Sequence, residues 1–196
     1  MMRFPMMRLF GLLVAGALNI SPAFGMDIEI QGNQVVMSGP VTGTECSQLL
    51  PILQQNPIHI IVLTQSNGGN ADAGYCVGEL VRQYRLATLI RGSCNSSCSR
   101  MWLGGVSRML DGANSRVGLH GNYDRRGNLL PGAPGRLQTW ISSYAPVNKL
   151  LLEQWTVLPV NRQMMFFYND RAELCDRGRC TAMPGWNALS AGLSTK

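Results

Sequence analysis

The chain has 196 residues, of which 45% are hydrophobic and 14% are charged, and its formal net charge is +6. This length suits one domain with a substantial core. The 17 basic residues form no run, and the aromatic residues do not interleave with them as in a single-strand binding groove. We therefore expect no nucleic-acid partner.

The N-terminal segment has the pattern of a secretory signal peptide. Two arginines precede an apolar run over residues 9–20, no acidic residue is present, and small residues stand just before Met26. The run is shorter than the roughly 20 apolar residues that a membrane-spanning helix needs, and no later segment approaches that length. We expect a cleaved signal peptide over 1–25 and one periplasmic or secreted domain over 26–196, with no integral membrane segment.

Six cysteines remain after that segment, and an even count in an exported protein indicates disulfides. The favoured pairs are Cys175 with Cys180, Cys94 with Cys98, and Cys46 with Cys76. A metal site is the competing interpretation. It is less favoured because the two short cysteine pairs differ in spacing, whereas zinc sites use matched pairs and often histidine. No metal and no other cofactor are expected.

The order of the expected elements indicates an α/β domain. Residues 27–30 and 34–37 flank a Gly-Asn turn, which predicts a β-hairpin. Residues 47–53 predict a short helix. The continuous apolar run 59–63 predicts a strand that is buried on both faces of a parallel sheet.

Two strand-helix-strand units follow. Asn70 can cap a helix whose apolar residues recur every three or four positions, and residues 87–90 form the next strand. A helix through Trp102 and strands at 108–110 and 116–119 complete the second unit. Ligands of open parallel sheets bind beyond the carboxyl ends of the strands, so we expect the site there.

The C-terminal third is expected to be mainly helical. A loop rich in Gly, Asn, Arg and Pro covers residues 121–135 and is expected near the site. The expected helices are 137–144, 150–155, and one capped by Asn161 that carries residues 164–167. A polar loop closed by cysteines then follows.

Ser96 and His120 are the main candidate catalytic residues. Ser96 lies in a small-residue turn that leads into a helix, where helix-terminal N–H groups can stabilise an oxyanion. A serine hydroxyl becomes a strong nucleophile when a base removes its proton, and histidine has a suitable pKa near neutral pH. His120 ends a strand on the same sheet edge as Ser96. His59 begins a strand at the opposite edge and is interpreted as structural.

These residues resemble the Clp protease branch of the Clp/crotonase superfamily. The shared pattern is Ser66-x-Gly68-Gly69, a helix, Gly92-x-x-x-Ser96, and Asn114-Ser115-Arg116-Val117-x-x-His120. The match extends over residues 37–120, and 183–193 is similar to the family's closing helix. Exported members with Cys-x-Ser-x-Cys around the serine are similar to residues 94–98. The resemblance implies an α/β, Clp/crotonase-like spiral of repeated ββα units with a parallel sheet and a C-terminal helical arm.

The resemblance also implies roles for particular residues. Ser96 would be the nucleophile and His120 the general base, with an oxyanion hole formed by the backbone N–H groups of Gly68 and Ser97. In the Clp branch an aspartate before the closing helix orients the histidine. Asp170 is the expected substitute here.

The function expected from these features is an exported serine peptidase-like hydrolase that acts by acyl transfer on peptides or unfolded segments, without ATP. The resemblance further suggests homo-oligomers. The alternative is a catalytically inactive envelope protein of the same fold with a binding or scaffold role. An acyl-CoA enzyme is disfavoured because exported compartments lack free CoA. A thiol-disulfide role for Cys94 and Cys98 is disfavoured because redox pairs typically have two intervening residues.

Overall fold

The computed structural model describes residues 25–124, 126–158 and 163–196. The strands are β1 (Asp27–Gln31), β2 (Gln34–Ser38), β3 (Ile60–Ser66), β4 (Ala87–Asn95), β5 (Ser107–Leu110), β6 (Arg116–Leu119), β7 (Gln163–Phe167), β8 (Ala172–Asp176) and β9 (Arg179–Ala182). The helices are α1 (Glu45–Gln55), α2 (Ala71–Gln83), α3 (Ser97–Leu103), α4 (Ala133–Tyr144) and α5 (Lys149–Trp155). The expected signal peptide falls outside the described residues, apart from its last position. None of the helices in the described part of the chain has the length and hydrophobicity of a membrane span.

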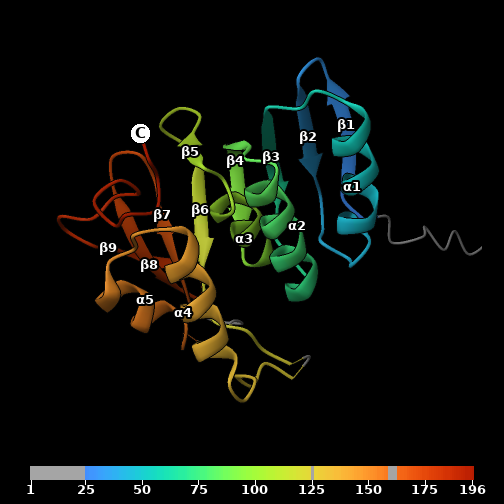
Figure 1. Ribbon diagram of the computed structural model, residues 1–196. Helices are drawn as coiled ribbons and strands as arrows, with labels where there is room; N and C mark the ends of the chain where they lie inside the picture. The colour runs from blue at the N-terminus through green and yellow to red at the C-terminus, as the bar shows by residue number, and fades with distance from the viewer. Residues whose placement is uncertain (1–24, 125, 159–162) are drawn as a thin grey trace, which may run out of the picture.

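One sheet joins the nine strands of the described residues, in the order β1-β2-β3-β4-β6-β7-β8-β9, and β5 pairs with β4 beside this path (Figure 1). The strands β2, β3, β4 and β6 are parallel to one another. The β1–β2 hairpin and the pairs from β6 to β9 are antiparallel. The expected hairpin and parallel strands are therefore confirmed, in a mixed α/β fold.

Strand β4 extends beyond the expected residues 87–90 and pairs with two different strands along its length. Its first half, Ala87 to Ile90, pairs with β5, and its last three residues pair with β6. Gly92 lies between the two halves with φ of +95°, a conformation that glycine adopts without steric cost. The chain can therefore change partners within one strand and continue to Asn95 at the edge of the site.

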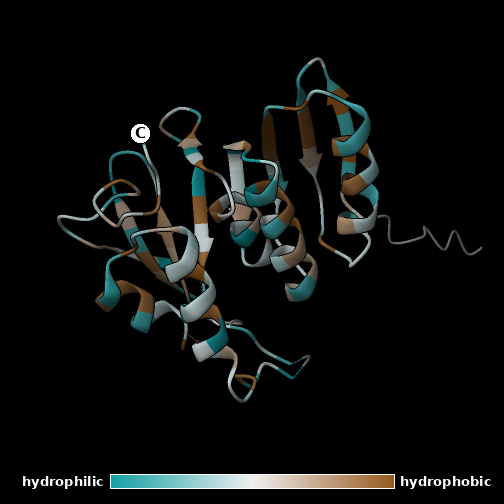
Figure 2. Ribbon diagram, in the orientation of Figure 1, coloured by the Kyte–Doolittle hydropathy of each residue, from teal (hydrophilic) through white to brown (hydrophobic). Residues whose placement is uncertain are grey.

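The parallel part of the sheet forms the interior of the domain. Figure 2 shows mainly hydrophobic residues on β2 and β3, whereas the helices carry both hydrophobic and hydrophilic residues. The alternating β2 strand and the continuous apolar β3 strand are both largely buried. Helix α2 begins as expected, because the Asn70 side chain accepts a hydrogen bond of 3.0 Å from the Ala73 N–H.

The prediction of a helix over residues 164–167 is wrong. These residues belong to strand β7, which pairs with both β6 and β8, and the expected cap Asn161 lies outside the described residues. A short apolar run fits a helix or a strand equally well, and pairing with two neighbours decides for the strand. The closing helix expected over 183–193 is also absent from this part of the chain. Its residues form successive turns, with Gly192 in the left-handed region.

All three expected cysteine pairs are disulfides: Cys46–Cys76, Cys94–Cys98 and Cys175–Cys180. The expected polar loop between the last two cysteines is a hairpin, since Cys175 and Cys180 face each other across β8 and β9. Its turn residues Arg177 and Gly178 both have positive φ, as in the tight turns that suit twisted strands. Three disulfides fit an oxidising compartment.

Candidate active site

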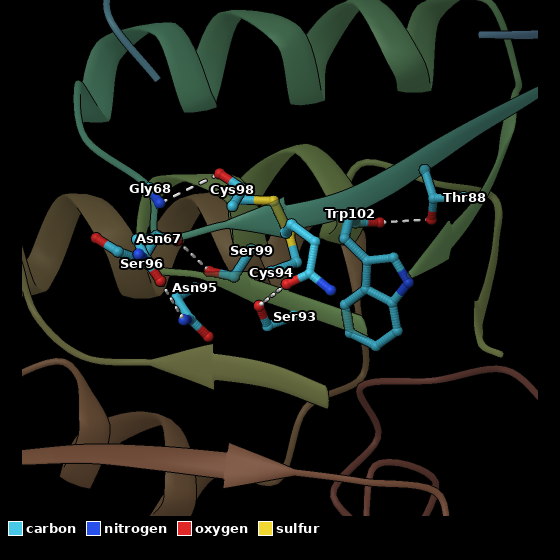
Figure 3. Close-up of a disulfide and its surroundings, with 12 residues drawn as sticks. Asn67, Gly68, Thr88, Ser93, Cys94, Asn95, Ser96, Cys98, Ser99 and Trp102 are labelled. Carbon is cyan, nitrogen blue, oxygen red and sulfur yellow. Dashed lines mark hydrogen bonds between the residues drawn. A yellow bond between two sulfur atoms is a disulfide. The ribbon is translucent and has the colours of Figure 1, made fainter. Parts of the chain in front are cut away.

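Ser96 lies on a sharp turn between β4 and α3. Its φ and ψ are 55° and −123°, a conformation that costs a non-glycine residue about 1–3 kcal/mol and persists only when the surroundings impose it. Its N–H donates to the Gly118 carbonyl at 2.9 Å. Its own carbonyl accepts from the Ser99 hydroxyl at 2.5 Å, as Figure 3 shows. These bonds hold the Ser96 backbone in its strained geometry.

The neighbouring backbone allows only glycine at position 68. A Cβ there would lie 2.6 Å from the Asn95 carbonyl oxygen and 2.7 Å from the Ser96 Cβ, and Gly68 has φ of +83°. A Cβ at Gly74 would likewise lie 2.4 Å from the Ser97 carbonyl oxygen. The loop after β3 and the first turn of α2 are thus packed directly against the Ser96 turn.

The Cys94–Cys98 disulfide links the end of β4 to the first turn of α3. It joins the residues two positions before and two positions after Ser96, with the Cα atoms 5.3 Å apart (Figure 3). Both cysteines are fully buried. The link therefore closes the Ser96 turn from its inner side, while Ser96 itself is half-buried.

Ser96 and His120 lie on the wall of one cavity of about 540 Å³. Four loops that follow parallel strands line it: Val41 and Thr42 after β2, Gly69 after β3, Ser96 after β4, and His120 after β6. The structure thus places the two candidate catalytic residues on the wall of one cavity at the carboxyl edge of the sheet. The exposed His59 stands at the opposite edge, just before β3.

His120 is held in a defined orientation. Its Nδ1 lies 2.5 Å from the Gly121 carbonyl oxygen, and its ring centroid is 5.4 Å from that of Tyr123. A carbonyl can only accept, so this hydrogen bond requires the proton on Nδ1 and leaves Nε2 unprotonated. The pKa of His120 is lowered to about 4, mainly by burial. The hydrogen bond to the Gly121 carbonyl acts in the opposite direction, and the Arg100 charge adds to the lowering. His120 is therefore neutral at pH 7.

Asp170 does not lie near His120, and its expected role as the orienting acid is corrected. Strand β7 is antiparallel to β6, with Val117 opposite Phe167, so Asp170 lies beyond the start of β6 whereas His120 lies beyond its end. At about 3.3 Å per residue, the two are separated by roughly 20 Å along the strand direction. The Asp170 side chain is 62% exposed and pairs with Arg171 at 3.0 Å. The Gly121 carbonyl, and not Asp170, is the hydrogen-bond partner of His120 Nδ1.

One of the two backbone N–H groups expected to form the oxyanion hole, that of Gly68, is not available at the cavity. The Gly68 N–H donates to the Ser66 hydroxyl at 3.2 Å, and Gly68 is not among the residues that line the cavity. Gly69 does line it, and its N–H has no hydrogen-bond partner among the described residues. Ser97 begins α3, where N–H groups of the first turn lack partners within the helix.

Arg100 is a buried cation that sequence reasoning missed. It is 2% exposed, its guanidinium lies 5.1 Å from the Tyr75 ring centroid, and one amino group donates to the Asn122 side chain. Its Nε and Nη1 atoms have no partner, and none of the ion pairs among the described residues includes it. The sequence did carry a signal, because this arginine directly precedes the apolar run Met-Trp-Leu. The structure shows that every residue of this helix is buried.

One group of side chains in the described part of the chain is spaced for a metal ion: Glu173, Cys175 and Cys180. Both sulfur atoms belong to a disulfide, so neither can serve as a thiolate ligand. This group therefore does not fit a metal site. It also lies on the antiparallel β8–β9 hairpin, away from the cavity-lining residues.

Comparison with known proteins supports the fold. No protein-family model matches the sequence, and no curated protein sequence matches it. Among solved structures, the chain is similar to a point mutant of ClpP1 from Listeria monocytogenes, with a TM-score of 0.50 and 17% sequence identity. The match covers 66% of this chain and 84% of the other. At this identity the likeness shows a Clp-like fold and does not extend to activity.

Proposed function

We propose that the protein is an exported serine peptidase-like hydrolase that transfers acyl groups of peptides or unfolded segments to Ser96, without ATP. The observation that carries this proposal is the shared cavity. It holds a serine in a strained turn at a helix start and a buried histidine whose unprotonated nitrogen is Nε2. A serine, a base and backbone N–H groups at one cavity are the components that acyl transfer requires.

In the proposed reaction, His120 Nε2 accepts the proton of the Ser96 hydroxyl while the Ser96 oxygen attacks the substrate carbonyl carbon. The oxyanion that forms accepts hydrogen bonds from the Ser97 N–H and the Gly69 N–H, which we assign in place of the Gly68 N–H. The imidazolium then gives its proton to the leaving amine as the C–N bond breaks. Water hydrolyses the acyl-enzyme by the same base catalysis and restores Ser96.

In this scheme the Gly121 carbonyl orients the His120 ring, as an aspartate would. It fixes the tautomer of His120, but it carries no full negative charge to stabilise the imidazolium. The low pKa of His120, about 4, therefore makes it a weaker base than a histidine paired with a carboxylate. We expect slow turnover of ordinary peptides and faster reaction with activated acyl or phosphonyl groups.

Export, assembly and the finer fold belong to the same proposal. The three disulfides support a periplasmic or secreted location. The order of β2 to β6 is compatible with a spiral of repeated ββα units, and α4 and α5 would form the helical arm of a homo-oligomer.

Activity-based labelling tests the proposal. The oxidised protein without residues 1–25 is treated with a fluorophosphonate probe, alongside Ser96→Ala, His120→Ala and the control Ser93→Ala, whose hydroxyl lies 3.5 Å from Gln65 instead. We expect labelling of the wild type and the control, none of Ser96→Ala, and a loss of at least about 100-fold in His120→Ala. Labelling that persists in Ser96→Ala would refute the assignment of the nucleophile.

The second candidate is a catalytically inactive protein of the same fold with a binding or scaffold role. The observation that favours it is Arg100, a buried cation that opposes protonation of His120, in a site where Nδ1 of the histidine is paired with a neutral carbonyl and not with a carboxylate. Folded wild-type protein that resists the probe over the pH range 5–9 would favour this candidate.

A further inference from the structure

Glu45 is a fully buried carboxylate at the first position of α1. It accepts hydrogen bonds from the Thr42 N–H at 2.7 Å, the Gly43 N–H at 2.8 Å and the Thr42 hydroxyl at 3.0 Å. The Met26 N–H lies 3.5 Å from one of its oxygens, and no lysine, arginine or histidine among the described residues pairs with it. A buried carboxylate held by N–H and O–H donors forms charge-assisted bonds, which are the stronger class of hydrogen bond.

The segment that Glu45 holds is part of the cavity wall. Val41 and Thr42 both line the cavity. On its other side, Val41 is joined to the loop after β3 by two backbone bonds. Its N–H donates to the Gly68 carbonyl at 3.0 Å, and its carbonyl accepts from the Asn70 N–H at 2.8 Å.

These two bonds determine the direction of the Gly69 N–H. Val41 and Gly69 form a parallel bridge, in which Val41 bonds to the residues on either side of Gly69. The N–H and carbonyl of Gly69 therefore point away from Val41. The contact is also close, because a Cβ at Gly69 would lie 2.1 Å from the Val41 carbonyl oxygen.

The Cys46–Cys76 disulfide reinforces the same arrangement. It joins α1, next to Glu45, to α2, and the cap of α2 is Asn70. The short segment from Val41 to α1 is thus fixed at its end by a disulfide and within its turn by a carboxylate. The direction of the Gly69 N–H therefore also depends on Glu45 and on the Cys46–Cys76 disulfide, none of whose residues lines the cavity.

We propose that Glu45 is a positioning residue that fixes the Val41–Thr42 segment and thereby holds the Gly69 N–H as an oxyanion donor. The inference rests on the proposed hydrolase function. Glu45 would stabilise the transition state indirectly. It bonds to the 42–43 turn, and Val41 in turn bonds to the loop that carries Gly69. Glu45 is fully buried and is not among the residues that line the cavity, so it takes no part in proton transfer.

The test compares Glu45→Gln with a matched control, Glu79→Gln, which changes an exposed acid on α2. The new amide at position 45 would place an NH₂ donor against an N–H donor, so one bond to the 42–43 turn is lost. With the fluorophosphonate probe we expect the maximal labelling rate of Glu45→Gln to fall at least about tenfold, with the half-saturating probe concentration within twofold. The acid limb of the pH-rate profile should not move, because His120 keeps its environment. A general loosening of the site would shift that limb.

Amide hydrogen exchange of the same variants gives a readout that needs no activity. We expect the Asn70 amide to exchange at least about tenfold faster in Glu45→Gln, while the Val77 amide within α2 keeps its wild-type rate. Wild-type rates of both labelling and Asn70 exchange in Glu45→Gln would overturn the inference. Absence of labelling in the wild type would instead refute the proposed function, and the exchange data would still decide whether Glu45 holds the loop.

Discussion

The parallel and antiparallel parts of the sheet both contain a short-range disulfide and a glycine with positive φ, but these features have different surroundings. Each has a short-range disulfide, Cys94–Cys98 in one and Cys175–Cys180 in the other, and each has a glycine with φ near +80° beside it, Gly68 or Gly178. In the parallel part these features are packed against the Ser96 turn. In the hairpin of β8 and β9, Gly178 and Cys180 are exposed and only Cys175 is buried. The comparison teaches that the surroundings, more than the local geometry, decide what a constrained turn contributes.

Parallel strands also explain where the site forms. The carboxyl ends of β2, β3, β4 and β6 meet at one edge, so the loops after them converge on one cavity. Antiparallel strands alternate in direction, and consecutive loops lie at opposite edges. The β7–β9 part therefore cannot collect loop residues in the same way, and Asp170 lies at the wrong end to reach His120.

Replacing the two glycines is the sharpest test of this contrast. We expect Gly68→Ala to lower the free energy of unfolding by about 3 kcal/mol or more and to abolish fluorophosphonate labelling, because its Cβ would overlap the Ser96 turn. We expect Gly178→Ala to cost only about 1 kcal/mol, since nothing lies within 4 Å of its Cβ. Urea unfolding measures both. Equal losses of unfolding free energy in the two variants would show that the positive φ alone determines the destabilisation.

Acidification should act on the parallel part through His120. The unfolded chain binds a proton at this residue below pH about 6.5, whereas the folded protein binds it only near pH 4. The free energy of unfolding should therefore fall by about 3 kcal/mol as the pH falls from about 6.5 to about 4. Unfolding curves at several pH values measure this.

The controls for this pH dependence are two histidine variants. His120→Gln, which cannot titrate, should lose this part of the pH dependence, and His59→Gln, at an exposed position, should keep it. The labelling rate should have its acid limb near pH 4, because the base is lost only when it is protonated. An acid limb near pH 6.5 would contradict the buried placement of His120.

Removing the two short disulfides compares the same covalent device in the two parts. Cys94→Ala with Cys98→Ala, and Cys175→Ala with Cys180→Ala, open loops of similar length, so chain entropy predicts a loss of about 2 kcal/mol for each. We expect only the first pair of substitutions to slow labelling, by at least about tenfold, because that disulfide spans Ser96. Equal labelling rates of the two variants would show that hydrogen bonds alone hold the turn.

The smallest effect is expected at Asp170. Its ion pair with Arg171 is exposed, and such pairs contribute about 0–1 kcal/mol. Asp170→Asn should change the free energy of unfolding by less than about 0.5 kcal/mol and the labelling rate by less than twofold. A loss of labelling comparable to that of His120→Ala would show that Asp170 reaches the histidine in the working protein.

Local patterns in the sequence were enough to predict much of the N-terminal half of the sheet and the disulfides. The β1–β2 hairpin, the apolar β3 strand, the Asn70 cap and the cysteine pairs depend on turn chemistry, periodicity and spacing over a few residues. The pairing of Ser96 with His120 in one cavity followed from a topological rule, that strand ends meet at one edge. These features are local or follow from the strand order, so one sequence suffices for them.

Tertiary structure alone decided the rest. Residues 164–167 became a strand because β6 and β8 offer two pairing edges, and Asp170 was separated from His120 by an antiparallel register that no short pattern encodes. The buried cation Arg100 and the carboxylate Glu45 depend on contacts between segments distant in the chain. The sequence by itself thus determined the elements and the candidate nucleophile and base. Long-range packing determined which polar groups surround them, because burial and hydrogen bonding depend on neighbours from the whole fold.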